Sequence, residues 1–166
     1  MLCRSREEAE SALARMRAWV SANGLTLHPD KTHVGDCRVE GQGFEFLGYR
    51  FEAGQRWVRK KSLMSLRDKI RAKTKRNVGH SIECVIASLN STLKGWFGYF
   101  KQAQRFVFKS VDGFVRRRLR AILRRQKHRP GQGRCLLDHK QWPNAFFADL
   151  GLFTMYEAHQ LACQSR

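Results

Sequence analysis

The chain has 166 residues, of which 42% are hydrophobic and 11% aromatic, and this composition excludes a wholly disordered protein. Its 32 Lys and Arg side chains against 14 Asp and Glu give a formal net charge of +18. No apolar run is long enough to span a membrane, and the charged first residues differ from a secretory signal, so we expect a cytoplasmic protein without a membrane partner.

The positive charge is concentrated in two tracts. Residues 56–76 hold ten Lys and Arg and one acid, and residues 101–134 hold twelve Lys and Arg and one acid. Neither tract has the mixed signs of a solvated helix face, so we expect its charge to be met by anions from outside the chain. Nucleic acid is the commonest such partner, because each phosphate contact releases counterions.

The first expected element is a helix over residues 5–23. Ser5 and Glu8 have the spacing of a capping box, and Gly24 provides a stop. The expected apolar face of this helix carries Ala9, Leu13, Met16 and Val20. Pro29 then favours an extended or turn conformation in the residues before it.

Residues 44–51 begin with the alternation of a strand, with the alternating phenylalanines directed inward. Gly48 interrupts the pattern and predicts a bulge or a close approach of backbone. Residues 52–56 have the composition of a turn, and residues 57–58 are the expected returning strand. The pattern predicts a small antiparallel unit.

Helical periodicity dominates from residue 62 onward. The expected helices cover residues 62–74, 81–101 and 106–127, and a final helix starts at Thr154. Ser62 and Ser81 are the expected N-caps of the first two, and residues 127–134 are expected to be a basic linker. The predicted fold class is α+β, with a short N-terminal helix and a small antiparallel hairpin followed by a helical bundle.

The sequence contains no pattern that indicates catalysis. No close pair of carboxylates offers a two-metal site, and no hydrolase, zincin or P-loop motif occurs. We therefore expect no catalytic residue, no metal and no cofactor in this chain. Cys135, His139, His159 and Cys163 have the ligand types of a zinc site, but the pairs are loosely spaced, so we favour ordinary side chains over a zinc site.

The strongest candidates for nucleic-acid contact are Arg117, Arg120 and Arg124. They share one face of the 106–127 helix, where guanidinium groups can contact successive phosphates. The alternative interpretations are the flank of a coiled coil, a solubility face and a membrane-surface helix. The full set of expected contacts lies in the two tracts: Arg59, Lys60, Lys61, Arg71, Lys73, Lys75, Arg76, Arg116, Arg117, Arg120, Arg124 and Arg125.

Several segments follow one another in an order typical of a known family. They are GLTLHPDKT at 24–32, FLGYRF at 46–51, LNSTLKGWFGYF at 89–100, DGFVRRRLR at 112–120 and WPNAFF at 142–147. Together they resemble the reverse transcriptase/maturases that group II introns encode, over nearly the whole chain.

The resemblance implies a division of the chain into three parts. Residues 1–60 would be the end of the reverse transcriptase palm with its primer-grip hairpin. Residues 61–130 would be the maturase or thumb helices, and residues 131–166 a basic linker and a C-terminal helical tail. By the same resemblance, Lys31 would lie near nucleotide phosphates. The primer-grip positions would be Phe46, Leu47, Gly48, Tyr49 and Arg50.

One departure from the family matters for function. The polymerase centre needs a Tyr-x-Asp-Asp pair and an earlier aspartate, and neither that motif nor a fingers region occurs here. We therefore expect a truncated maturase that binds structured intron RNA and assists splicing. The alternatives are one half of a split RNA-directed DNA polymerase, with target DNA or a separate fingers and palm polypeptide as partner, and an inert remnant of a decayed retroelement.

Overall fold

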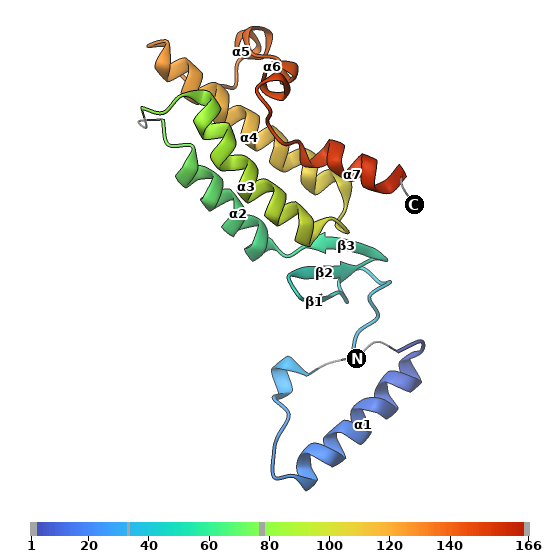
Figure 1. Ribbon diagram of the computed structural model, residues 1–166. Coiled ribbons are helices and arrows are strands. Elements are labelled where there is room, and N and C mark those ends of the chain that lie inside the picture. The colour runs from blue at the N-terminus through green and yellow to red at the C-terminus, as the bar shows by residue number, and fades with distance from the viewer. Residues whose placement is uncertain (1–2, 33, 77–78, 165–166) are drawn as a thin grey trace. The chain divides into compact units, whose positions relative to one another are not determined.

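The computed structural model describes residues 3–32, 34–76 and 79–164, and it confirms the expected α+β class. Figure 1 labels its helices and strands. The chain divides into two compact units. Unit 1 comprises Met1–Glu45 and Phe51–Gln55, and unit 2 comprises Phe46–Arg50 and Arg56–Arg166.

Unit 1 contains the helix α1, Arg6–Ala22. The expected N-cap is confirmed, because the Ser5 hydroxyl accepts a hydrogen bond from the Glu8 amide at 3.2 Å. The Glu8 carboxylate accepts a hydrogen bond from the Arg4 amide at 2.8 Å. A capping box would instead require the amide of the N-cap residue, Ser5. The expected apolar face is incompletely covered, since Met16 is 38% exposed.

Three short strands form one antiparallel sheet in the order β1-β2-β3. They are β1 (Phe44–Phe46), β2 (Tyr49–Glu52) and β3 (Gln55–Val58). Leu47 and Gly48 both have positive φ, 47° and 79°, so they form a turn between β1 and β2. The expected bulge at Gly48 is therefore wrong, and the segment is two strands instead of one.

The second expectation for Gly48, a close approach of backbone, is confirmed. A Cβ at this position would lie 3.2 Å from the Phe100 ring and 3.4 Å from the Ser62 hydroxyl. The expectation that Phe46 points inward is wrong, because its side chain is 59% exposed. The reason is that β1 ends at Phe46 and the chain turns there.

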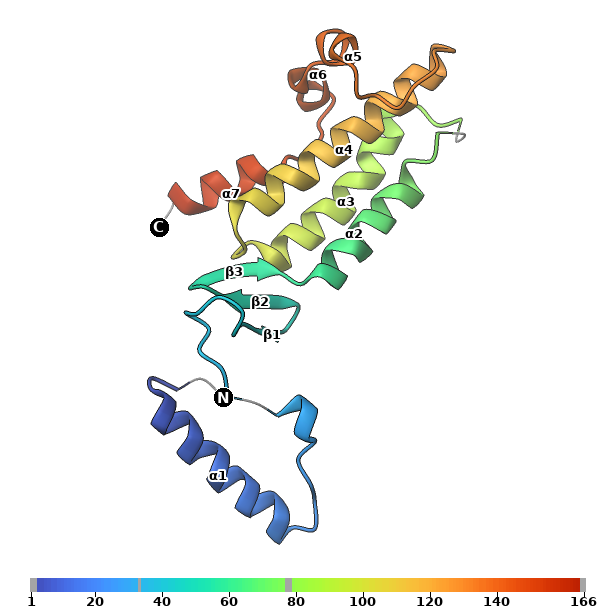
Figure 2. The ribbon, with the colours of Figure 1, turned by 180° about the vertical axis from the view of Figure 1, so that it is seen from behind.

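Unit 2 is built on a three-helix bundle. Its helices are α2 (Lys60–Lys73), α3 (Ile82–Phe100) and α4 (Arg105–Gln126). Each contacts the other two, and they lie side by side in both views (Figures 1 and 2). The predicted helical periodicity is confirmed by the side chains that are almost fully buried between them: Leu66, Ile70, Ile86, Leu89, Leu93, Phe108, Val111, Val115, Leu119 and Ile122.

The two predicted N-caps in this bundle have different outcomes. Ser81 caps α3 as expected, since its hydroxyl accepts from the Cys84 amide at 3.3 Å. Ser62 does not cap α2, because that helix already begins at Lys60 with Arg59 as its N-cap residue. The Arg59 amide instead donates to the Gly48 carbonyl at 2.8 Å, which ties the start of α2 to the β1–β2 turn.

The C-terminal segment contributes three more helices, of which the sequence predicted only the last. They are α5, Leu136–Gln141, α6, Asn144–Asp149, and α7, Met155–Gln164. Side chains of this segment are buried in the same core as the bundle: Trp142, Phe147, Leu152 and Met155. Within the described ranges, no helix is long and apolar enough to cross a bilayer.

Asp112 anchors α7 on α4. Its side chain is buried, and its carboxylate accepts hydrogen bonds from the amides of Met155 at 3.1 Å and Tyr156 at 2.9 Å. These amides belong to the first turn of α7, where a negative charge is favourable. Desolvation raises the pKa of Asp112, and the two amide bonds oppose that shift.

Replacing Asp112 by Ala is expected to lower the free energy of unfolding by about 1–2 kcal/mol, because one buried and one half-buried amide lose their acceptor. Asp112→Asn keeps one acceptor oxygen and should lose less. Urea unfolding followed by circular dichroism measures both changes. The matched control is Asp149→Ala at an exposed position, which should change stability by less than about 0.5 kcal/mol. Equal losses in both alanine variants would contradict the anchoring role.

Candidate nucleic-acid interface

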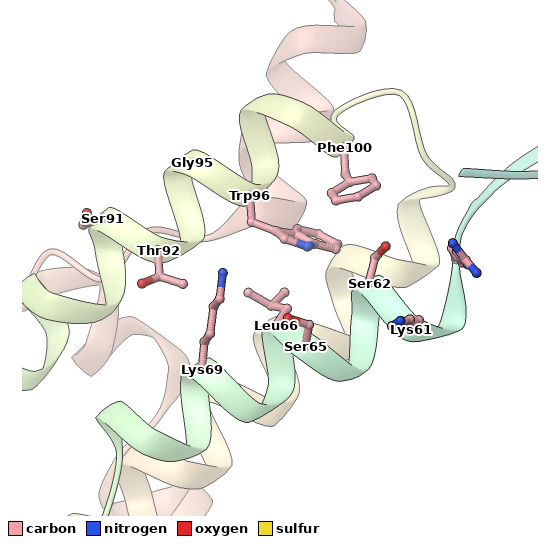
Figure 3. A pocket seen from close by; sticks show the side chains of 11 residues that line it. Lys61, Ser62, Ser65, Leu66, Lys69, Ser91, Thr92, Gly95, Trp96 and Phe100 are labelled. Carbon is pink, nitrogen blue, oxygen red and sulfur yellow. The ribbon is translucent and has the colours of Figure 1, made fainter. Parts of the chain in front are cut away.

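A groove of about 590 Å³ lies between α2 and α3 in unit 2. Its lining combines cations, hydroxyl groups and aromatic rings, and Figure 3 shows the side chains. The lining residues are Arg59, Lys61, Ser62, Ser65, Leu66, Lys69, Ser91, Thr92, Gly95, Trp96 and Phe100.

Helical spacing accounts for the groove. On α2, Ser62, Ser65 and Lys69 follow one another at intervals of three and four residues, so they share one side of the helix. The side of α3 that faces them carries small residues: Ser91, Thr92 and Gly95. A Cβ at Gly95 would meet no atom within 4 Å, so the groove stays open at this point.

Two aromatic side chains form the apolar part of the groove. The ring centres of Trp96 and Phe100 lie 4.7 Å apart. The ring centres of Trp96 and Phe108 lie 6.3 Å apart in an edge-to-face arrangement. Phe108 is fully buried. The aromatic part of the groove is therefore an extension of the core and is held rigidly by it.

The polar part of the groove is suited to an anion. Lys69 extends from α2 toward α3 in Figure 3. Among the described residues, no carboxylate forms an ion pair with Lys61 or Lys69. Ammonium groups beside hydroxyls can bind a sugar–phosphate backbone, because lysine attracts the phosphate while hydroxyls both donate and accept hydrogen bonds.

The turn between β1 and β2 is fixed to the end of α3. The Tyr49 hydroxyl donates to the Tyr99 carbonyl at 2.8 Å, and the Tyr99 hydroxyl donates to the Leu47 carbonyl at 2.9 Å. Phe46 and Leu47 at this turn are 59% and 65% exposed, whereas Arg50 in β2 is half-buried. The turn thus presents two apolar side chains in the same unit as the groove.

A second group of cations lies between α2 and α4. The guanidinium carbons of Arg67, Arg71 and Arg117 lie 5.9, 5.5 and 5.2 Å from the centre of the Phe114 ring. We call these four residues the arginine cluster. Arg71 also forms an ion pair with Asp68 on the surface of α2.

Residues 63–142 match the family model described as the group II intron, maturase-specific domain. The match supports a maturase. It covers both sides of the groove from Ser65 onward and the whole arginine cluster. A search of the curated proteins found no match to the chain.

Within this maturase-like segment, Arg117, Arg120 and Arg124 do not form the exposed row that the sequence predicted. Arg120 is only 2% exposed, and its guanidinium donates to the Trp142 carbonyl at 2.9 Å and to the Asn144 side chain at 3.0 Å. Desolvation lowers the pKa of Arg120. Arg120 holds the C-terminal segment on α4, so we do not include it in the proposed interface.

Arg124 is also engaged inside the protein. Its guanidinium pairs with the buried Asp138 at 2.6 Å and donates to the Pro130 carbonyl. The expectation that the tract 101–134 has no partner within the chain is therefore wrong at this position. Asp138 lies outside the tract in sequence, and only the fold of the following segment brings it back to α4.

Arg118 stabilises the end of α2. Its guanidinium donates to the Thr74 hydroxyl at 2.9 Å, the Thr74 carbonyl at 2.6 Å and the Arg71 carbonyl at 3.3 Å. These are acceptors at the C-terminus of the helix, where a cation is favourable. Arg118 therefore has a structural role.

The other predicted cations are distributed over unit 2. Lys73 donates to the Ser88 hydroxyl at 2.8 Å, and Arg76 donates to the Gly131 carbonyl at 3.2 Å. Arg59 and Lys61 line the groove, and Arg71 and Arg117 belong to the arginine cluster. Exposed positions are occupied by Lys60, Lys75 and Arg125, and a half-buried position by Arg116.

The remaining predicted residues lie elsewhere. Lys31 is exposed in a 3₁₀ turn, Pro29–Lys31, of unit 1. The Cys163 sulfur lies 3.8 Å from the His159 ring, whereas the Cys135 sulfur accepts from Arg124. No group of three or more His, Cys, Asp or Glu within the described ranges could hold a metal ion, so the structure does not assemble the four possible zinc ligands, His139 included.

Several residues of the candidate interface were not predicted from the sequence. They are Ser62, Ser65, Lys69, Ser91, Thr92 and Gly95 in the groove, and Arg67 and Phe114 in the cluster. The signal that could have found the groove is its spacing, because serines at 62 and 65 and a lysine at 69 share one helix side. The cluster has no such signal, since it joins two helices.

Arg120→Ala is expected to lower the free energy of unfolding by about 1–3 kcal/mol, because the buried Trp142 carbonyl loses its donor. Arg125→Ala, at an exposed position of the same helix, is the control and should change it by less than about 0.5 kcal/mol. Thermal and urea unfolding of both variants measure the difference. An Arg120→Ala protein as stable as the control would refute the buried role.

Proposed function

We propose that this chain binds the structured RNA of a group II intron along the groove between α2 and α3 and thereby assists splicing. The observation that carries the proposal is a groove that Lys69 lines together with the hydroxyl residues Ser65, Ser91 and Thr92, all within the segment that matches the maturase-specific domain. The RNA carries the chemistry of splicing, and the protein supplies positive charge and a complementary shape.

The chemistry of the groove favours RNA over DNA. An A-form helix exposes its ribose 2′-hydroxyls along a wide, shallow minor groove, where hydroxyl side chains can pair with them. Lys61 and Lys69 line the same groove and would contact the adjoining phosphates. A DNA duplex of the same sequence lacks the 2′-hydroxyls and loses that part of the interaction.

Cations outside the groove add a long-range attraction. Lys60, Lys75 and Arg125 are exposed, and the chain as a whole carries a formal charge of +18. Such a field accelerates association and makes the affinity depend strongly on salt. We expect this part of the binding to be independent of sequence.

The exposed apolar turn would contribute a different contact. Phe46 and Leu47 are exposed and could cover a ribose or the edge of a base at the end of a nucleic-acid strand. They belong to the hairpin that the family resemblance matches to a primer grip. Because Tyr49 and Tyr99 tie the turn to α3, such a contact would be positioned relative to the groove.

The groove proposal predicts a loss of RNA affinity in the variant Lys61→Gln/Lys69→Gln. Titration of an in vitro transcribed group II intron RNA at two salt concentrations is the measurement. The affinity should fall about tenfold or more, and the slope of log affinity against log salt should become shallower by about 1.5, because two phosphate contacts are lost.

The matched control is Lys109→Gln/Lys140→Gln, which removes the same charge from exposed positions outside the groove. It should keep most of the affinity. Equal weakening in the two double variants would mean that net charge alone binds the RNA. The thermal unfolding temperature of each variant shows whether the fold is retained.

One observation favours a second candidate function, a half of a split reverse transcriptase. Met16, Trp19 and Leu25 in unit 1 are 38%, 65% and 60% exposed, an apolar surface suited to a fingers and palm polypeptide. Primer extension by a mixture of this chain with such a polypeptide tests it. If the mixture does not extend the primer while the chain still binds RNA, the split-polymerase candidate is rejected and the maturase proposal is retained.

A further inference from the structure

The helix α2 carries cations on two opposite sides. Lys69 points into the groove, whereas Arg71, two residues later, lies roughly 160° away around the helix axis. Arg67 is on the same side as Arg71, because a spacing of four residues returns to one helix face. The helix therefore separates a lysine and hydroxyl surface facing α3 from an arginine surface facing α4.

Phe114 gathers the guanidinium groups on the α4 side. The carbon atoms of three guanidinium groups lie between 5.2 and 5.9 Å from the ring centre. A cation–π contact orients a planar guanidinium without neutralising its charge. Because the ring is already engaged by arginines, the ligand expected here is an anion and not a stacked base.

The cluster holds more positive charge than nearby acids neutralise. Among the described residues, Asp68 is the acid that pairs with it, through an exposed ion pair with Arg71. Burial and then the charges of Arg134 and Arg71 lower the pKa of Arg117. The buried Arg67 Nε has no hydrogen-bond partner in the described part of the chain. Crowded cations are stabilised when an anion binds, because the anion offsets their mutual repulsion.

We propose that the arginine cluster is a second phosphate-binding site, so that the chain holds two RNA backbone segments at once, one on each side of α2. Arg71 and Arg117 can contact phosphate oxygens through guanidinium N–H groups, and Arg67, whose Nη2 donates to the Ser110 hydroxyl at 3.4 Å, adds positive charge beside them. The two-segment arrangement rests on the proposed function of the groove. The phosphate site at Phe114 stands on its own geometry.

Bridging two RNA segments gives the second site a function. A protein that binds two backbone segments raises their effective concentration with respect to each other, and this stabilises a compact RNA. The bridge needs the two sites on a rigid element. Leu66 and Ile70 are almost fully buried, and their packing holds α2 in place between the two sites.

Energy transfer between two labelled RNA duplexes tests the bridge. The full chain is mixed with equal amounts of one short RNA duplex labelled with a donor dye or with an acceptor dye. The native chain should bring the two together, and the signal should vanish in excess protein, where each duplex binds its own chain. Arg71→Gln/Arg117→Gln should abolish energy transfer and weaken the second binding event about tenfold, while one duplex still binds.

The lysine variant Lys61→Gln/Lys69→Gln separates the two proposals. It should also abolish energy transfer, by losing the other site, whereas Lys109→Gln/Lys140→Gln should retain it. Unchanged energy transfer in the arginine variant overturns the second site. If only the arginine variant loses RNA binding and the lysine variant binds normally, the groove proposal fails and the phosphate site at Phe114 is retained.

Two further measurements keep the test decisive. If the double arginine variant unfolds at a lower temperature than the native chain, the single variant Arg71→Gln, at an exposed position, replaces it. Polyglutamate serves as the competing ligand. Should polyglutamate lose affinity in the arginine variant while RNA does not, the cluster binds acidic protein segments and the proposal is overturned.

Discussion

The burial of Leu66 and Ile70 determines which way α2 faces, and the proposed interface depends on that orientation. Once these two side chains are packed against α3 and α4, helical geometry directs Lys69 to one side and Arg71 to the other. The start of the helix is held by the Arg59 amide on the Gly48 carbonyl, and its end by Arg118. The cations on α2 are therefore carried by a helix that is fixed at both ends.

Arginines that look alike in sequence have different roles in this fold. On α4, Arg118, Arg120 and Arg124 bind carbonyls and acids of neighbouring segments, whereas Arg117 remains in a crowded cationic cluster. The cost of leaving a buried helix end or loop carbonyl unpaired explains why an arginine is used there. A dense arginine tract thus combines side chains that are bound within the protein with side chains that stay in a cationic cluster.

Much of the fold could be predicted from local patterns, and less of the site. The periodicity of α3 and α4 and the Ser81 cap depend on residues within a few positions of each other, so they were visible in the sequence. The β1–β2 turn was mistaken for a bulge, because Leu47 adopts a positive φ that is uncommon for a branched side chain. The helices α5 and α6 were missed because six residues are too few to show a period.

The sequence by itself determined the charge, the α+β class, the main helices and the resemblance to intron maturases, since these depend on composition and on neighbouring residues. Only the tertiary structure decided which cations remain available to a ligand. Asp138 reaches Arg124 and the Trp142 carbonyl reaches Arg120 through the folding of the C-terminal segment. The physical reason is that pairing depends on distance in space, and contacts between α2, α3 and α4 join residues that lie far apart along the chain.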